Sequence, residues 1–398
     1  MKVVIGLIFC SALGAQRIAF VQNGQLWVKA SPSGQAQSIV PSGNPHAPQF
    51  SADGEWVAFL EGDLLGVVAS KGGEIHRPLG AQPVSQFQWS ETAGSLAVVT
   101  EDSVYVTSAS VDWTPSRIFA GDPESVVFSP DGKQIAISSL ESDQDGVPQR
   151  GKLAISPVDG NALDKTIETA TQWEQILPFA WSGDTILAWK GEISGSAESD
   201  GFEVWGYSVS GGPPRKLGGP ALISRELHGL SSDGNKLALT NGEGRQAWTN
   251  KTITVIDLRM GESTSLTSNN AAALYPAWSP SGGQIAFIQG PDAGDVWGGE
   301  DAKAALNQRH LWIMDPDGAH KQQLTSDPNF RDERPVWSAD GKSLFFLRLD
   351  RHDQGSLWTI DLSGGEPRLL AGPVVLDHDG WFGYYGRVNW SDWVAISR

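Results

Sequence analysis

A short motif constrains the fold of this 398-residue chain more than any other feature: an aromatic residue, a serine and then a tight turn. The motif occurs as PQFSADGEWVAF, VVFSPDGKQIAI, PAWSPSGGQIAF and PVWSADGKSLFF. The Asp-Gly pair found in most copies suits a tight turn that needs positive φ, and the apolar residues around it favour β-strands. Because nearly the same hairpin recurs along the chain, it predicts the repeating unit of the fold.

We call the aromatic–serine pair the anchor of each repeat. The anchors are Phe50-Ser51, Trp89-Ser90, Phe128-Ser129, Trp181-Ser182, Trp278-Ser279, Trp337-Ser338 and Trp390-Ser391, with a degenerate copy at Leu230-Ser231. Their successive spacings are 39, 39, 53, 49, 48, 59 and 53 residues. Apolar residues between anchors alternate with a period near two, which excludes helical repeats. Each spacing therefore accommodates four short strands, as in a propeller blade.

The two ends of the chain carry incomplete repeats. Residues 17–40 supply the later strands of a blade, and residues 386–397 supply an anchor strand without later ones. The sequence thus predicts an all-β fold: a single β-propeller of eight four-stranded antiparallel blades, closed by pairing of the N- and C-terminal strands. Seven blades with one irregular terminus is the alternative, because IAFV and VAIS are both suited to be a second strand.

One region resembles a known family. LWIMDPDGAHKQQLTSDP (311–328), followed by RPVWSADGKSLFFLR (334–348), resembles the repeat of the TolB-like propellers. These are mostly exported bacterial proteins related to the propellers of the Tol envelope system and of prolyl oligopeptidases. The resemblance extends from about Arg17 and implies the fold, because the matching residues are turn and packing residues. The Tol protein carries an α/β domain before its propeller, for which residues 1–16 leave no room, so its partners are not carried over.

The N-terminal segment MKVVIGLIFCSALGA (1–15) resembles a short export signal, with one lysine, an apolar run and small residues. It predicts a periplasmic or extracellular bacterial protein with a propeller domain at 16–398. The alternative is a first β-strand from Val3 to Phe9 in a cytoplasmic protein. Cys10 is the only cysteine, so an intrachain disulfide is excluded. Phe9 disfavours lipidation of Cys10, since that signal prefers a small residue there.

Charge restricts the class of partner. The chain has 46 acidic and 29 basic residues, a net charge of −17, and no cluster of lysine or arginine. Nucleic-acid binding rests on clustered cations and is not expected. The apolar N-terminal run is too short to span a bilayer, so the chain is not an integral membrane protein. We expect a monomer whose partner is an envelope protein or a glycan.

Catalytic motifs are missing from the sequence. It contains no Gly-x-Ser-x-Gly, His-Glu-x-x-His, Cys-x-x-Cys, P-loop or dinucleotide motif. The seven histidines are scattered singly. We therefore predict a non-enzymatic binding or scaffold protein without a cofactor, although a bound cation such as calcium is left open. The alternative is a propeller enzyme acting on polysaccharide, a lyase or glycosidase, with a metal or carboxylate site built from several blades.

Charged residues gather just before the anchors. In a propeller the outer strand of one blade leads to the inner strand of the next, so these positions are expected at one mouth of the central channel. We predict a site there for a small ligand, a cation or a partner's loop. The alternative is that the charges pair with each other and keep the channel hydrated. The residues are His46, Glu124, Arg225, Glu226, Arg331, Asp332, Glu333, Arg334 and Arg387.

A long insertion, IQGPDAGDVWGGEDAKAALNQRHLW (288–312), separates the second and third strands of one repeat. Long loops in compact repeats are usually functional or disordered. We expect a solvated loop in preference to a metal site, because the spacing of its acids matches no EF-hand. Together with insertions at 141–151 and 190–203 it would form a rim for protein or glycan contact. The rim-loop candidates are Asp292, Asp295, Trp297, Glu300 and Asp301.

The segment LDHDGWFGYYGRVNW (376–390) is the most aromatic in the chain. We expect its rings to pack in the seam between the last and first blades. A platform on which sugars stack is the alternative.

Overall fold

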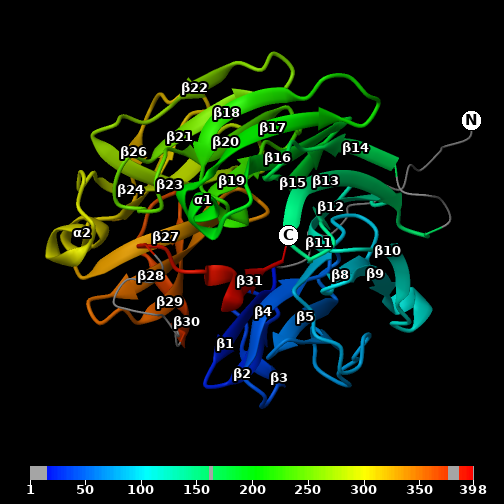
Figure 1. The fold of residues 1–398 in the computed structure, drawn as a ribbon. Coiled ribbons are helices and arrows are strands. Elements are labelled where there is room, and N and C mark those ends of the chain that lie inside the picture. Colours follow the sequence, from blue (N-terminus) through cyan, green and yellow to red (C-terminus); the bar gives the residue numbers. More distant parts are fainter. Residues whose placement is uncertain (1–15, 161–164, 375–384, 398) are drawn as a thin grey trace, which may run out of the picture.

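The computed structural model describes residues 16–160, 165–374 and 385–397, which form mainly β-strands. Antiparallel sheets follow one another around a common centre, and the N-terminal sheet lies beside the C-terminal ones (Figure 1). This confirms the all-β propeller. The predicted export signal, Cys10 and most of the aromatic segment 376–390 lie outside the described residues.

Consecutive strands pair within each sheet. A three-stranded sheet contains β4 (Pro45–Phe50), β5 (Trp56–Glu61) and β6 (Leu64–Ala69). The next sheet contains β7 (Gln86–Trp89), β8 (Ser95–Val99), β9 (Ser103–Ser108) and β10 (Ser116–Ala120). The sheet after it contains β11 (Pro123–Phe128), β12 (Gln134–Ser142), β13 (Pro148–Pro157) and β14 (Lys165–Thr169). The last two contain β23 (Ala271–Trp278), β24 (Ile285–Pro291), β25 (His310–Met314) and β26 (Gln322–Gln323), then β27 (Phe330–Trp337), β28 (Ser343–Asp350), β29 (Gly355–Asp361) and β30 (Arg368–Val374).

An eight-stranded sheet lies between these groups. It contains β15 (Glu174–Ser182), β16 (Thr185–Glu192), β17 (Phe202–Ser208) and β18 (Arg215–Ala221), then β19 (His228–Leu230), β20 (Lys236–Asn241), β21 (Thr252–Asp257) and β22 (Ser263–Ser265). Only the pair of Ala221 and Asn241 joins β18 to β20. Divided there, the described strands provide one unit for each of the eight expected blades, and the blade number itself stays a prediction.

The remaining sheet joins the two ends of the chain. It contains β1 (Ile18–Gln22), β2 (Gln25–Lys29), β3 (Ala36–Val40) and β31 (Val394–Ile396). Innermost β31 pairs antiparallel with β1, and Ala395 lies opposite Ala19. The predicted closure is confirmed: VAIS supplies the innermost strand and IAFV the second.

One anchor assignment is wrong. Trp390-Ser391 lies in the 3-10 helix η3 (Trp390–Asp392) and not at the end of a strand. Ser397 takes the anchor position instead, because its Oγ accepts a 2.7 Å hydrogen bond from the Arg17 N–H and its own N–H donates to the Arg17 carbonyl. The Trp-Ser pair matched the repeat in residue type but not in its place along the strand.

The anchor serine builds the turn that follows it. Ser338 Oγ donates to Asp340 Oδ1 at 2.7 Å and accepts from the Ser343 N–H at 2.9 Å. The Lys342 N–H donates to the same Asp340 oxygen. The same network occurs at Ser51, Ser129 and Ser231. The repeated Ser-x-Asp-Gly sequence therefore serves to build the turn.

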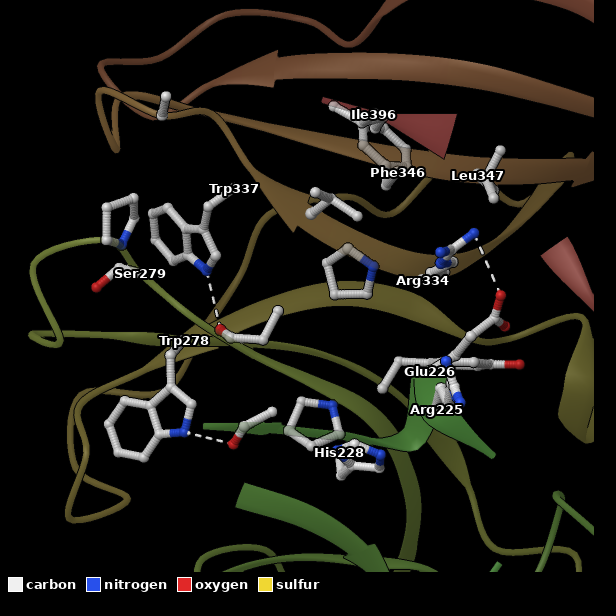
Figure 2. A pocket seen from close by; sticks show the side chains of 18 of the residues that line it. Arg225, Glu226, His228, Trp278, Ser279, Arg334, Trp337, Phe346, Leu347 and Ile396 are labelled. Carbon is white, nitrogen blue, oxygen red and sulfur yellow. Dashed lines mark hydrogen bonds and ion pairs between the residues drawn. The ribbon is translucent and has the colours of Figure 1, made fainter. Parts of the chain in front are cut away.

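The anchor tryptophan links neighbouring sheets. The indole N–H of Trp337, in β27, donates to the Ala277 carbonyl in β23 at 2.9 Å, and Figure 2 shows this bond beside that of Trp278. Each acceptor lies one residue before the anchor of the preceding repeat. The equivalent bonds are Trp278 to Gly229 and Trp89 to Gln49, each 3.1 Å. The indole groups of these three anchors thus hold adjacent blades in register, whereas the Trp181 indole donates to the Gly183 carbonyl of its own turn.

We predict that Trp337→Phe lowers the free energy of unfolding by about 0.5–1.5 kcal/mol, because it leaves the partly buried Ala277 carbonyl without its donor. Urea unfolding followed by tryptophan fluorescence and circular dichroism measures the change. Trp297→Phe is the matched control, since Trp297 is 89% exposed. Equal stabilities of the two variants would contradict a bond between blades.

Candidate functional site

The innermost strands enclose two neighbouring cavities. The anchor cavity, of about 680 Å³, is lined by residues that include His228, Trp278, Arg334, Trp337 and Ile396 (Figure 2). The mouth cavity, of about 540 Å³, is lined by residues that include Gln86, Glu124, Glu198 and Arg387. Arg225, Glu226 and Tyr275 line both cavities. The two cavities therefore share one group of polar side chains.

β-Bulges re-aim side chains at this centre. Tyr275 has φ +57° and Arg334 has φ +44°, and each lies where the pairing register of its strand shifts. Both residues come three positions before an anchor, as does Ala47 at a similar shift in β4 (φ +51°). A bulge bends the strand and redirects a side chain. In β23 and β27 the residue at the bulge lines the cavities.

Glu226 and Arg334 form an ion pair across the shared centre. The Arg334 Nη1 lies 3.2 Å from Glu226 Oε1, and Figure 2 shows this pair. The Glu226 side chain is 7% exposed and also accepts a 2.8 Å hydrogen bond from the Ser391 N–H. Burial raises the pKa of Glu226, although Arg334 and Ser391 act in the opposite direction. The structure thus brings these two predicted residues together.

The other three charges before Trp337 do not face an open mouth. Arg331, Asp332 and Glu333 are all buried. Asp332 Oδ1 accepts a 2.6 Å bond from Arg348 Nε in β28, and Asp332 Oδ2 accepts from the Thr325 hydroxyl. This corrects the expected position of the three residues. The cause is local pairing, because a buried charge requires a counter-charge close by.

Glu333 is held in the same way. Its Oε1 lies 3.5 Å from Arg309 Nη1 and 3.4 Å from Arg331 Nε, and its Oε2 accepts a 2.9 Å bond from the Trp390 indole. Arg309 is itself buried and donates to the Ala247 carbonyl at 2.7 Å. Arg309 and Arg348 were not predicted from the sequence, since neither lies just before an anchor.

Two arginines at the mouth cavity have no carboxylate partner among the described residues. Arg225, in the 3-10 helix η2 (Arg225–Leu227), donates one 3.2 Å hydrogen bond to the Val126 carbonyl. Burial lowers the pKa of Arg225 to about 10, so the side chain stays charged at neutral pH. Arg387 is half-buried, and its Nε has no hydrogen-bond partner in the described part of the chain.

Two glutamates line the same cavity. Glu124 lies in β11, and Glu198 lies in the helix α1 (Gly195–Asp200) that the sequence analysis missed within the insertion at 190–203. The Gln175 amide donates to Glu198 at 2.8 Å. Burial raises the pKa of Glu124, and the negative charges of Asp122 and Glu198 act in the same direction. These effects disfavour the Glu124 charge, even though the residue as a whole is exposed.

His46 lies apart from this group. Its Nε2 is 3.0 Å from the Gly62 carbonyl, and it lines a different cavity together with Asp392. His228, close to the shared centre, packs on Phe179 with ring centroids 4.4 Å apart. Burial lowers the pKa of His228 to about 3, so this imidazole is neutral. Among the described residues, no group of three His, Cys, Asp or Glu side chains is arranged to hold a metal ion.

Some of the acidic residues in the insertion 288–312, the predicted rim loop, have structural roles. Asp292 accepts hydrogen bonds from the Thr249 hydroxyl and the Asn250 N–H, at 2.8 and 2.7 Å. Glu300 and Asp301 lie in the first turn of α2 (Gly299–Leu306), where negative charge complements the helix dipole. The expected solvated loop thus contains a short helix, whose Leu306 packs against Trp248.

Asp295 and Trp297 remain available at the surface. Both line a polar groove of about 980 Å³, which Arg245 also lines. Trp297 is 89% exposed. These two residues are the part of the predicted rim that the local fold does not require.

Comparison with known proteins agrees with the fold. No known protein-family profile matches the chain. A 73-residue stretch is 33% identical to the Tol-Pal system protein TolB of Zymomonas mobilis, and covers 18% of this chain and 16% of that protein. The chain is thus similar to the TolB-like propellers.

Solved structures with the same fold have different functions. A eukaryotic initiation factor is 12% identical with a TM-score of 0.56, covering 88% of this chain and 84% of that one. Oligogalacturonate lyase in complex with manganese is 12% identical with a TM-score of 0.54, covering 88% and 98%. Dipeptidyl peptidase 4 of Porphyromonas gingivalis is 13% identical with a TM-score of 0.56, covering 82% and 53%. These similarities show the fold alone.

In the described part of this chain, no helix has the length and apolar character needed to span a lipid bilayer.

We predict that Glu124→Gln raises the midpoint of thermal unfolding at pH 7. The pKa of Glu124 is higher in the folded state than in the unfolded chain, so folding is penalised once pH exceeds the unfolded value near 4.3. The difference from wild type should vanish as pH falls below that value, where both states carry a protonated Glu124. Differential scanning calorimetry at several pH values measures this.

Glu101→Gln, at an exposed position, is the control for this measurement. An unchanged or lower midpoint for Glu124→Gln at pH 7 would contradict the assigned environment of Glu124.

Proposed function

We propose that the chain is a non-enzymatic binding propeller of the bacterial cell envelope. An export segment at 1–15 precedes the propeller domain at 16–398. The propeller recognises a small ligand or a loop of a protein partner at the mouth of its channel. Arg225, Glu226 and Arg387 provide the charged surface of this site, and Trp297 on the rim offers an exposed aromatic contact.

The proposal rests on a difference between the buried charged residues, which form ion pairs, and those at the mouth cavity, some of which do not. Deep in the fold, Asp332 is paired with Arg348 and Glu333 with Arg309, so these carboxylates are engaged within the protein. At the mouth cavity, Arg225 forms no ion pair among the described residues and donates only to the Val126 carbonyl. Concave sites with a few convergent polar groups are typical ligand-binding sites. The accessible charge therefore lies where a ligand can enter.

The proposed location rests on two observations. The relative with the matching stretch is named a Tol-Pal system protein, and the N-terminal residues resemble an export signal. A polysaccharide-cleaving enzyme is the second candidate, because one structural neighbour is a lyase. It is less well supported, since Asp332 and Glu333 are tied to arginines and are poorly placed to act as a base or as metal ligands.

Native mass spectrometry tests the proposal. Wild-type protein is incubated with an envelope extract of its source bacterium, recovered and analysed for bound molecules. We expect an adduct with wild type that is lost with Arg225→Glu and retained with Arg117→Glu, a matched change at an exposed position on β10. Incubation with oligogalacturonate and manganese should leave the saccharide intact.

Two results would overturn the proposal. One is an adduct that survives Arg225→Glu, or no adduct at all. The other is cleavage of the saccharide by wild-type protein.

A further inference from the structure

The mouth cavity contains a hydrogen-bond donor and a hydrogen-bond acceptor that have no partner among the described residues. The Tyr275 hydroxyl and the Gln86 Oε1 are buried without a hydrogen-bond partner among the described residues. Both residues line the cavity, together with Arg225 and Glu124. Buried polar groups are nearly always satisfied, and each exception requires an explanation. A cavity that leaves both donors and acceptors unused is suited to a ligand that supplies both.

One group of residues suits an anion. Arg225 uses one hydrogen bond to the Val126 carbonyl, which leaves other guanidinium N–H groups for a ligand. Tyr275 is 2% exposed, and burial together with the charges of Glu333 and Glu226 raises its pKa well above the ordinary value. It therefore remains a hydroxyl donor at neutral pH. Guanidinium and hydroxyl groups together match the two oxygens of a carboxylate.

A second group of residues suits a cation. Glu124 comes from β11 and Glu198 from α1, and the two negative charges oppose each other. An ammonium group between them would relieve that repulsion and donate to carboxylate oxygens. The Gln86 Oε1 is an additional acceptor. The cavity is thus lined by acidic residues as well as by arginines.

We infer that the mouth cavity binds a small zwitterion, an amino acid or short peptide whose carboxylate meets Arg225 and Tyr275 and whose ammonium meets Glu124 and Glu198. A volume of about 540 Å³ is in the range of small-molecule sites and accommodates a dipeptide. This inference rests on the proposed binding function and names the class of ligand. Arg387, which lines the same cavity, adds positive charge.

Isothermal titration calorimetry with three matched probes tests the inference. Glycylglycine carries both charges, N-acetylglycylglycine only the carboxylate, and glycylglycinamide only the ammonium. We expect glycylglycine to bind at least about tenfold more tightly than either analogue, since each charged group adds charge-assisted hydrogen bonds.

Two variants assign the ends of the probe. Arg225→Gln should weaken glycylglycine and N-acetylglycylglycine by about tenfold or more and leave glycylglycinamide unchanged. Glu124→Gln should weaken glycylglycine and glycylglycinamide and leave N-acetylglycylglycine unchanged. Arg117→Gln and Glu101→Gln are matched controls at exposed positions. Circular dichroism spectra verify that each variant is folded.

The inference is overturned if the three probes bind equally, if none binds, or if both cavity variants bind as wild type does. These outcomes are separable from failure of the proposed function. An envelope adduct lost with Arg225→Glu, combined with no preference for glycylglycine, would retain the binding function and reject the zwitterion.

Discussion

Pairing of β31 with β1 is the constraint on which the rest of the structure depends. An open array of sheets would expose unpaired strand edges at both ends. Three residue pairs from the two ends of the chain close this sheet, and Ile18 and Phe20 of these pairs pack with Trp390 in one apolar cluster. Closure also fixes the innermost strands around a centre. The cavities exist because these strands face one another, so the site depends on a strand contributed by the last residues of the chain.

Some charged side chains of the channel form ion pairs with other side chains, and others do not. Asp332 and Arg348 form a buried pair, in which each charge offsets the cost of burying the other. Arg225 is exposed, has no carboxylate partner among the described residues, and lies against a cavity that solvent or a ligand can occupy. Burying a polar group without a partner costs free energy. The fold bears this cost at the mouth cavity through the Tyr275 hydroxyl, which is buried without a hydrogen-bond partner among the described residues.

Much of the fold follows from short-range chemistry that is visible in the sequence. Ser338 and Asp340 build the anchor turn through contacts within five residues, so repetition of those residue types predicts repetition of the structure. Trp390-Ser391 shows the limit of this reasoning, since residue type alone does not fix position along a strand. The helix α2 was missed because its segment begins among glycines and acids that favour a loop.

The candidate site was only partly predictable for a related reason. Position before an anchor placed Glu124 and Arg225 at the channel, because chain connectivity determines that location. The sequence did not reveal which charges are paired. The partners Arg309 and Arg348 lie well away from the anchors, and they are brought in by the packing of different strands. Tyr275 was missed because its role depends on a bulge and on burial, neither of which has a sequence signature here.

A crystal structure of the protein soaked in glycylglycine is the most direct test of the zwitterion site. We expect electron density for the dipeptide in the mouth cavity, with its carboxylate at Arg225 and its ammonium at Glu124. Density for water alone in that cavity, or a dipeptide bound elsewhere, would contradict it.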